Sequence, residues 1–157
     1  MARLADLGEW EQELLLQMLD EIPAYSGQPW QSGAPLAQRR VALLTTSGIH
    51  RHDDHAYSDG AVANEYRVIP GDVHADELVM SHLSSNFDRT GFQQDTNVVF
   101  PIDRLRELAT EGVIGSLAAF HYAVMGAARL PGLEATARQI AGLLKQDSVD
   151  AVLLTPV

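Results

Sequence analysis

Residues 149–157 (VDAVLLTPV) form a nearly continuous apolar run at the end of the sequence. This composition is typical of strands that are buried on both faces, as in a parallel sheet. We therefore predict a buried strand here, closed by Pro156. In open α/β sheets the ligand sites lie beyond the carboxyl ends of the strands. A functional loop is thus expected after Val157, where this sequence stops.

Apolar periodicity along the rest of the chain predicts strands that alternate with helices. The predicted strands lie at 41–46, 66–69, 78–80 and 120–125, and the predicted helices at 9–22, 101–112 and 132–146. This alternation favours an α/β fold, and we expect a Rossmann-like three-layer domain with a mostly parallel sheet. We expect a single domain over residues 1–157, in which an N-terminal helix and a Pro/Gly-rich loop (1–38) precede the core (39–157).

Charge and composition exclude several classes of partner. The net charge is −10, which disfavours nucleic acid and anionic membrane surfaces. No apolar run approaches the ~20 residues of a membrane span, and the N-terminus lacks the pattern of a signal peptide. The chain has no Cys, which excludes disulfides and thiol nucleophiles and fits a reducing, cytoplasmic environment.

The predicted N-terminal helix carries an apolar stripe. Trp10, Leu14, Met18 and Ile22 recur every four residues. Such a stripe needs cover, either from its own domain or from a partner. We therefore expect a homo-oligomer or a subunit that docks on another chain.

Three histidines and two aspartates lie together after the first predicted core strand. His50, His52 and His55, with Asp53 and Asp54, are candidate ligands for a divalent metal such as Zn, Fe or Mn. In an extended segment His50 and His52 share one face and His55 lies on the other, so a turn is needed to bring all three to one ion. A solvated polar loop is the alternative interpretation.

Other polar groups follow the ends of predicted strands. The turn at Ser47 and Gly48 offers backbone amides to a substrate carboxylate, or is simply a tight turn. Ser81 and His82 follow a second strand, where a histidine suits proton transfer. Further candidates are Asp88 and Asp95 as acid–base groups, Asn97 as a substrate or turn-ordering group, and His121 as a catalytic or a core histidine.

Several strings resemble a known family. They are TTSGIH (45–50), YRVIP (66–70), Ser81-His82, DTNVVFPIDRL (95–105), Gly115, HYAVMG (121–126) and VDAVLLTP (149–156). In this order they resemble the glycine/sarcosine/betaine reductase selenoprotein B family, which includes the small subunit of D-proline reductase. The resemblance covers roughly residues 40–157.

The resemblance implies reductive cleavage of a C–N bond by a selenocysteine or cysteine nucleophile. In many members this nucleophile follows directly after the strand that matches residues 149–156. Here only Val157 remains and no Cys is present. We therefore expect either that the sequence stops before the redox residue or that this member has lost it.

We expect a reductase-component-B-like protein that acts on or binds a small amino-acid-type substrate. The candidate catalytic residues are His50, His82, Asp88 and His121, and the candidate substrate-binding residues are Ser47, Gly48, Ser81, Asp95 and Asn97. His50 and His82 should lie at the same edge of one sheet. Two alternatives stay open: a Cys-free lyase, cyclase or hydrolase on the same fold, with or without a metal, and a non-catalytic partner subunit.

Overall fold

The computed structural model describes residues 3–20, 22, 24, 26–27, 30–58, 63–84 and 89–157. These residues divide into two compact units, Met1–Gln31 and Ser32–Val157, which are described separately.

The first unit holds a short 3₁₀ turn, η1 (Leu4–Asp6), and one helix, α1 (Glu9–Asp20). Helix α1 confirms the helix predicted at 9–22. None of its residues is buried, and Trp10 is 68% exposed. The expected burial of its apolar stripe, against its own domain or a partner chain, therefore stays a prediction.

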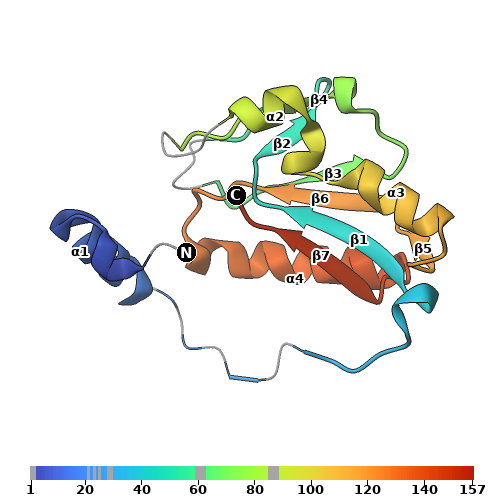
Figure 1. The fold of residues 1–157 in the computed structure, drawn as a ribbon, viewed down its shortest axis with the longest axis horizontal. Helices are drawn as coiled ribbons and strands as arrows, with labels where there is room; N and C mark the ends of the chain where they lie inside the picture. The colour runs from blue at the N-terminus through green and yellow to red at the C-terminus, as the bar shows by residue number, and fades with distance from the viewer. Residues whose placement is uncertain are drawn as a thin grey trace. The chain divides into compact units, whose positions relative to one another are not determined.

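The second unit is built on a mixed, mostly parallel sheet (Figure 1). Its strands are β1 (Arg40–Thr45), β3 (Tyr66–Pro70), β5 (Ser116–Leu117), β6 (Phe120–Val124) and β7 (Ala151–Thr155). β5 and β6 pair in parallel with successive parts of β1 along one of its edges, and β7 pairs in parallel with Val41–Thr45 of β1 along the other edge. β3 pairs antiparallel with β6. The α/β class and the mostly parallel sheet are thus confirmed.

One helix packs against each face of this sheet. The helices of the second unit are α2 (Thr90–Gln94), α3 (Ile102–Thr110) and α4 (Leu130–Gln146), with 3₁₀ turns η2 (Leu36–Gln38), η3 (Ala75–Glu77) and η4 (Thr96–Val98). Ala123 belongs to the core cluster that includes residues of α3, whereas its neighbours Tyr122 and Val124 pack with Ile140 of α4. Successive strand residues point to opposite faces, so β6 is buried on both sides.

The prediction of a last strand buried on both faces is wrong for this structure. β7 is an edge strand, and within the described residues no strand pairs with its outer side. Val152 and Leu153 are each 40% exposed and Leu154 is 62% exposed. An apolar composition indicates that a strand is suited to burial. It does not show whether another strand or helix is present to bury it.

A second, two-stranded sheet lies beside the main one and carries the candidate site. Its antiparallel strands are β2 (Ile49–Arg51) and β4 (Leu78–Met80). β2 falls in a stretch that showed no strand period in the sequence. In the part of the chain that the structure describes, no helix is both long enough and apolar enough to cross a membrane.

Candidate functional site

The β2–β4 ladder brings His50 and Ser81 into contact. His50 pairs with Val79, and Ser81 follows the end of β4. His50 Nε2 lies 2.7 Å from Ser81 Oγ, and its Nδ1 lies 2.8 Å from the Arg51 carbonyl oxygen. A carbonyl only accepts, so Nδ1 carries a hydrogen, and in the neutral form of the ring Nε2 is then the acceptor for the Ser81 hydroxyl. The pair therefore places an imidazole nitrogen within hydrogen-bond distance of a serine hydroxyl.

Tyr57 packs against His50 of this pair. Its ring meets the His50 ring edge-on, with centroids 6.2 Å apart, and its hydroxyl donates to the Ala123 carbonyl at 2.8 Å. Burial raises the pKa of the Tyr57 hydroxyl, so this group stays a neutral donor. The hydrogen bond joins the loop that carries Tyr57 to the main sheet.

Arg67 holds the same loop in place. Its guanidinium lies 4.4 Å from the centroid of the Tyr57 ring, a cation–π contact. It also donates to the carbonyl oxygens of His55 and Ala56, at 3.0 and 3.1 Å. The side chain is buried and lies 3.0 Å from a Glu65 carboxylate oxygen. Sequence analysis missed Arg67 and Tyr57, although a charged residue at an inward position of a short apolar strand was a usable signal.

His82 lies beside Ser81 and packs on the turn at Gly48. Gly48 has φ +65°, and a Cβ there would lie 3.3 Å from backbone atoms of His82. Glycine is therefore required both by the backbone angle and by the close approach. The Ser84 amide donates to His82 Nδ1 at 3.2 Å, and Arg89 donates to the His82 carbonyl. Burial, and then the Arg89 charge, lower the pKa of His82.

The structure places His50 on β2 and His82 two residues after the end of β4, so both belong to the small antiparallel sheet and not to an edge of the parallel sheet. His50 contacts Ser81, the residue before His82, and a site shared by the two histidines stays a prediction. The Ser47 and Gly48 amides donate within the protein, to Thr45 Oγ1 and the Val124 carbonyl. Their assignment to substrate stays a prediction.

Asp95 and Asn97 order the entry to α3. Asp95 Oδ1 accepts from the Asn97 amide and side chain, both at 2.9 Å, and these bonds lower the pKa of Asp95. Asn97 Oδ1 in turn accepts the Asp103 amide at 3.0 Å, in the first turn of the helix. This geometry fits the turn-ordering interpretation of Asn97.

His121 lies in the core instead of beside His50. Its Nδ1 accepts the Leu43 amide at 2.9 Å, and its ring meets Phe100 edge-on with centroids 5.9 Å apart. The side chain is fully buried. The interpretation of His121 as a core histidine fits these contacts.

The remaining site predictions concern the metal ligands and Asp88. His52 Nε2 lies 3.1 Å from the Asp76 carbonyl, and His55 is exposed. Over the described ranges, no group of three or more His, Asp or Glu is arranged to hold a metal ion. The metal site of His50, His52 and His55 stays a prediction, and Asp88 lies outside the described residues.

Comparison with known proteins identifies the family to which the chain is similar. The family model of glycine/sarcosine/betaine reductase selenoprotein B matches residues 1–157. The chain is 38% identical over 124 residues to the D-proline reductase subunit gamma of Acetoanaerobium sticklandii, which covers 76% of this chain and 49% of that protein. It is 35% identical over 124 residues to the glycine reductase complex component B subunit gamma of Symbiobacterium thermophilum, covering 76% of this chain and 29% of that protein.

A third relative matches over more of the chain. The sarcosine reductase complex component B subunit beta of Peptoclostridium acidaminophilum is 29% identical over 152 residues, which is 94% of this chain and 33% of that protein. The chain therefore spans about half the length of the first relative and about a third of the other two. No solved structure matches it. On the match over its whole length, the chain belongs to the glycine/sarcosine/betaine reductase selenoprotein B family.

Proposed function

We propose that this chain binds a small amino-acid-type substrate within a reductase complex and transfers a proton through Ser81 and His50. The observation that carries the proposal is the pair itself, with His50 Nε2 2.7 Å from Ser81 Oγ and Nδ1 tied to a backbone carbonyl. The relatives support the reaction class, because their names describe reductase subunits for D-proline, glycine and sarcosine.

The pair suits proton transfer for a physical reason. Histidine changes charge near neutral pH, and the Arg51 carbonyl keeps the accepting nitrogen directed at Ser81. His50 is buried, whereas Ser81 is partly exposed. A substrate group would therefore meet the hydroxyl first, and the hydroxyl would relay the proton to or from the imidazole. Cleavage of a C–N bond releases an amine, which needs such a proton.

The reducing group is proposed to lie outside these 157 residues. Thiol- or selenol-based reduction needs a nucleophile that forms a covalent intermediate and is then resolved by a second reducing group. The chain has no Cys, and serine and histidine do not cycle between oxidation states. Binding and proton transfer are the parts of the reaction that its residues suit.

An NMR titration of the full chain with D-proline, glycine, sarcosine and betaine tests the proposal. We expect at least one of the four to shift the resonances of residues around Ser81 and His50. Ser81→Ala should weaken that binding, because it removes the partly exposed hydroxyl, and His50→Gln should also do so. The pH dependence of binding should shift in His50→Gln, which a purely structural role would not produce.

His55→Gln is the matched control, since His55 is an exposed histidine of the neighbouring loop. It should leave binding unchanged. If none of the four compounds binds, the proposal fails. If His55→Gln weakens binding as much as His50→Gln and a divalent metal copurifies, the metal-dependent alternative replaces it. Substrate-dependent oxidation of a dithiol by this chain alone would contradict the assignment of the reducing group to another segment.

A further inference from the structure

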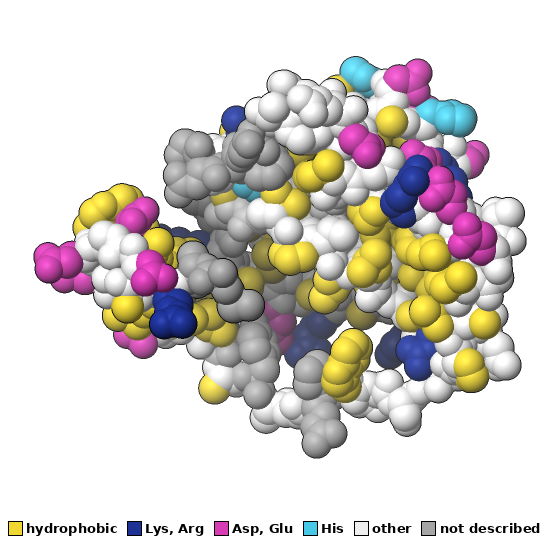
Figure 2. All heavy atoms as spheres, in the orientation of Figure 1, with side chains coloured by type: hydrophobic (Ala, Val, Ile, Leu, Met, Phe, Trp, Pro, Cys, Tyr) yellow, Lys and Arg dark blue, Asp and Glu magenta, His cyan; other side chains and the backbone are white. Residues whose placement is uncertain are grey.

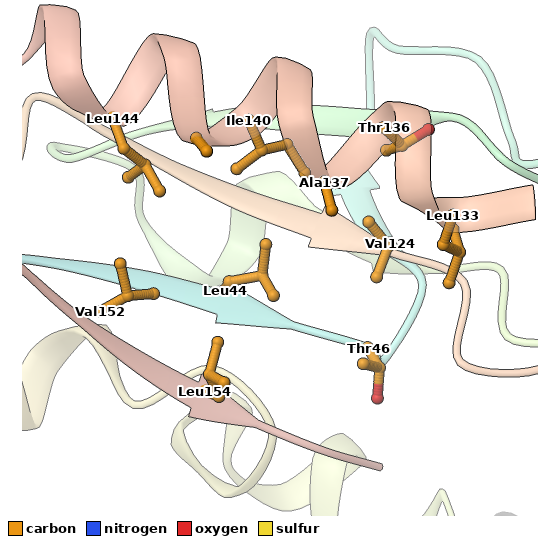
Figure 3. Close-up of a pocket in the computed structure, with 11 residues that line it drawn as sticks. Leu44, Thr46, Val124, Leu133, Thr136, Ala137, Ile140, Leu144, Val152 and Leu154 are labelled. Atoms are coloured by element: carbon orange, nitrogen blue, oxygen red, sulfur yellow. The ribbon is translucent and has the colours of Figure 1, made fainter. Parts of the chain in front are cut away.

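An apolar groove runs between α4 and the outer part of the sheet. Figure 3 shows side chains of α4, among them Leu133, Ala137 and Ile140, directed toward the sheet, where Val152 and Leu154 of β7 line the outer part of the groove. The groove has a volume of about 330 Å³, and its lining is apolar except for two threonines. The helix covers the inner strands, so the groove stays open on the side of β7.

The backbone of β7 is open on the same side. β7 residues pair in register with Val41–Thr45, and the Thr155 carbonyl accepts the Thr46 amide. Alternate residues of a strand direct their N–H and C=O groups to opposite edges. Thr155 and Leu153 therefore face β1, while Val152 and Leu154 direct their backbone groups outward. Within the described residues no strand meets these groups.

We propose that the outer edge of β7 pairs antiparallel with β7 of a second copy of this chain. With a twofold axis at Leu153, Val152 lies opposite Leu154 of the second copy, and these outward-facing residues exchange both backbone hydrogen bonds. The two Leu153 residues lie opposite each other at the axis. The proposal does not depend on the proposed function.

The residues of β7 suit a second copy as the occupant. The chain has 21 acidic residues, yet residues 151–157 (AVLLTPV) contain no charged side chain. Natural edge strands usually carry charges or prolines that prevent such pairing, and β7 carries neither between Ala151 and Thr155. Identical strands paired about Leu153 bring no like charges together. Figure 2 shows hydrophobic side chains gathered on the part of the surface where β7 and α3 lie.

Pairing in this register also closes the groove. Val152 and Leu154 both line it, so the Leu154 of each copy adds to the groove of the other. The two grooves then become one apolar layer beneath both α4 helices. Leu153 gains cover on the opposite face, where it is 40% exposed. One contact would therefore pair the open backbone edge, close the groove and bury the exposed leucines.

Sedimentation equilibrium of the full chain tests the contact, and we expect a dimer. Leu154→Lys places a charge at the edge and should raise the dissociation constant by at least about tenfold, a modest effect for a central interface residue. The matched control is Val68→Lys on β3, the last strand at the other side of the sheet, where Val68 is also 40% exposed. The control should not change the dissociation constant. Circular dichroism should show both variants folded.

A cysteine crosslink tests the register. In Leu153→Cys the introduced cysteine is the only one in the chain. Residues opposite each other in a non-hydrogen-bonded antiparallel pair have Cα atoms about 4.5 Å apart, within the range that a disulfide spans. Mild oxidation should therefore give a covalent dimer from Leu153→Cys and none from Val68→Cys.

Three results would overturn the proposal. They are a monomer at every concentration, a dimer that Leu154→Lys leaves unchanged, and equal crosslinking of the two cysteine variants. A monomer whose β7 amides resist hydrogen exchange would mean that another segment of the same chain covers the edge, which also rejects a second copy.

Discussion

His121 is held in its neutral form by its surroundings. The ring is fully buried, and desolvation, helped by the charge of Arg106, lowers the pKa of His121 to about 4 from an ordinary value of 6.5. The Leu43 amide donates to Nδ1, so protonation at that nitrogen would break a buried hydrogen bond. The folded chain therefore binds a proton at His121 only at lower pH than the unfolded chain does.

This difference predicts a pH dependence of stability. Above pH 6.5 His121 is neutral in both states, and between about pH 6.5 and 4 only the unfolded state gains the proton. The free energy of unfolding should therefore fall across this window, by on the order of 2–3 kcal/mol. Urea unfolding at several pH values measures it. Glu65, whose pKa is lowered from an ordinary value of 4.5 to about 2, loses its contribution as the pH falls below about 4.5.

The variant for comparison is His121→Gln. The amide oxygen of the glutamine can still accept a hydrogen bond from the Leu43 amide, and the glutamine side chain does not titrate. Its free energy of unfolding should fall less between pH 6.5 and 4 than that of the native chain. Parallel curves for the two proteins would show that His121 does not cause the dependence.

At the scale of elements, the start of α3 depends on one side chain. Asn97 accepts the Asp103 amide and donates to carboxylates of Asp95 and Asp103, so it joins the preceding turn to the helix. Asn97→Ala should lower the free energy of unfolding by about 1–2 kcal/mol, the range for lost helix caps. Urea unfolding checks this. Gln94→Ala, at the exposed end of α2, is the control and should change little; equal losses would contradict the assigned role.

The sequence predicted the elements that have their own period and missed those that depend on a distant partner. β6 and α4 lie within a few residues of their predicted ranges, because a short apolar run and the helical repeat are local signals. β2 was missed because its three residues are extended only by pairing with β4. The burial of β7 was predicted wrongly, because the same composition suits an interior strand and an uncovered edge.

At the scale of the whole molecule, the sequence named His50 and Ser81 as candidates but could not predict that their side chains meet across the β2–β4 ladder. Ser81 was a candidate from its position after β4, whereas the contact of Arg67 with the loop at His55 depends on tertiary packing. The charge of Arg67 within a short apolar strand was visible in the sequence, but the backbone carbonyls to which this buried guanidinium donates are identified only by the structure.

The N-terminal unit gives a prediction at the same scale. Trp10, Leu14, Met18 and Ile22 are all exposed in the structure, and burying a side chain of the Leu or Met type is worth about 1.5–3 kcal/mol. We expect that removing residues 1–22 lowers the melting temperature or dissociates an oligomer. Thermal unfolding and mass in solution measure these effects. An unchanged melting curve and an unchanged mass for the shortened chain would contradict the prediction that this apolar stripe is buried.

The uncharged edge of β7 lies on a strongly acidic molecule, with a net charge of −10. Two such molecules repel each other over a distance set by the ionic atmosphere, about 30 Å at 0.01 M salt and about 8 Å at 0.15 M. Backbone pairing and apolar contact act only at touching distance, and salt screens them little. Ionic strength would then control self-association of this chain, since added salt removes the long-range barrier and leaves the short-range attraction in place.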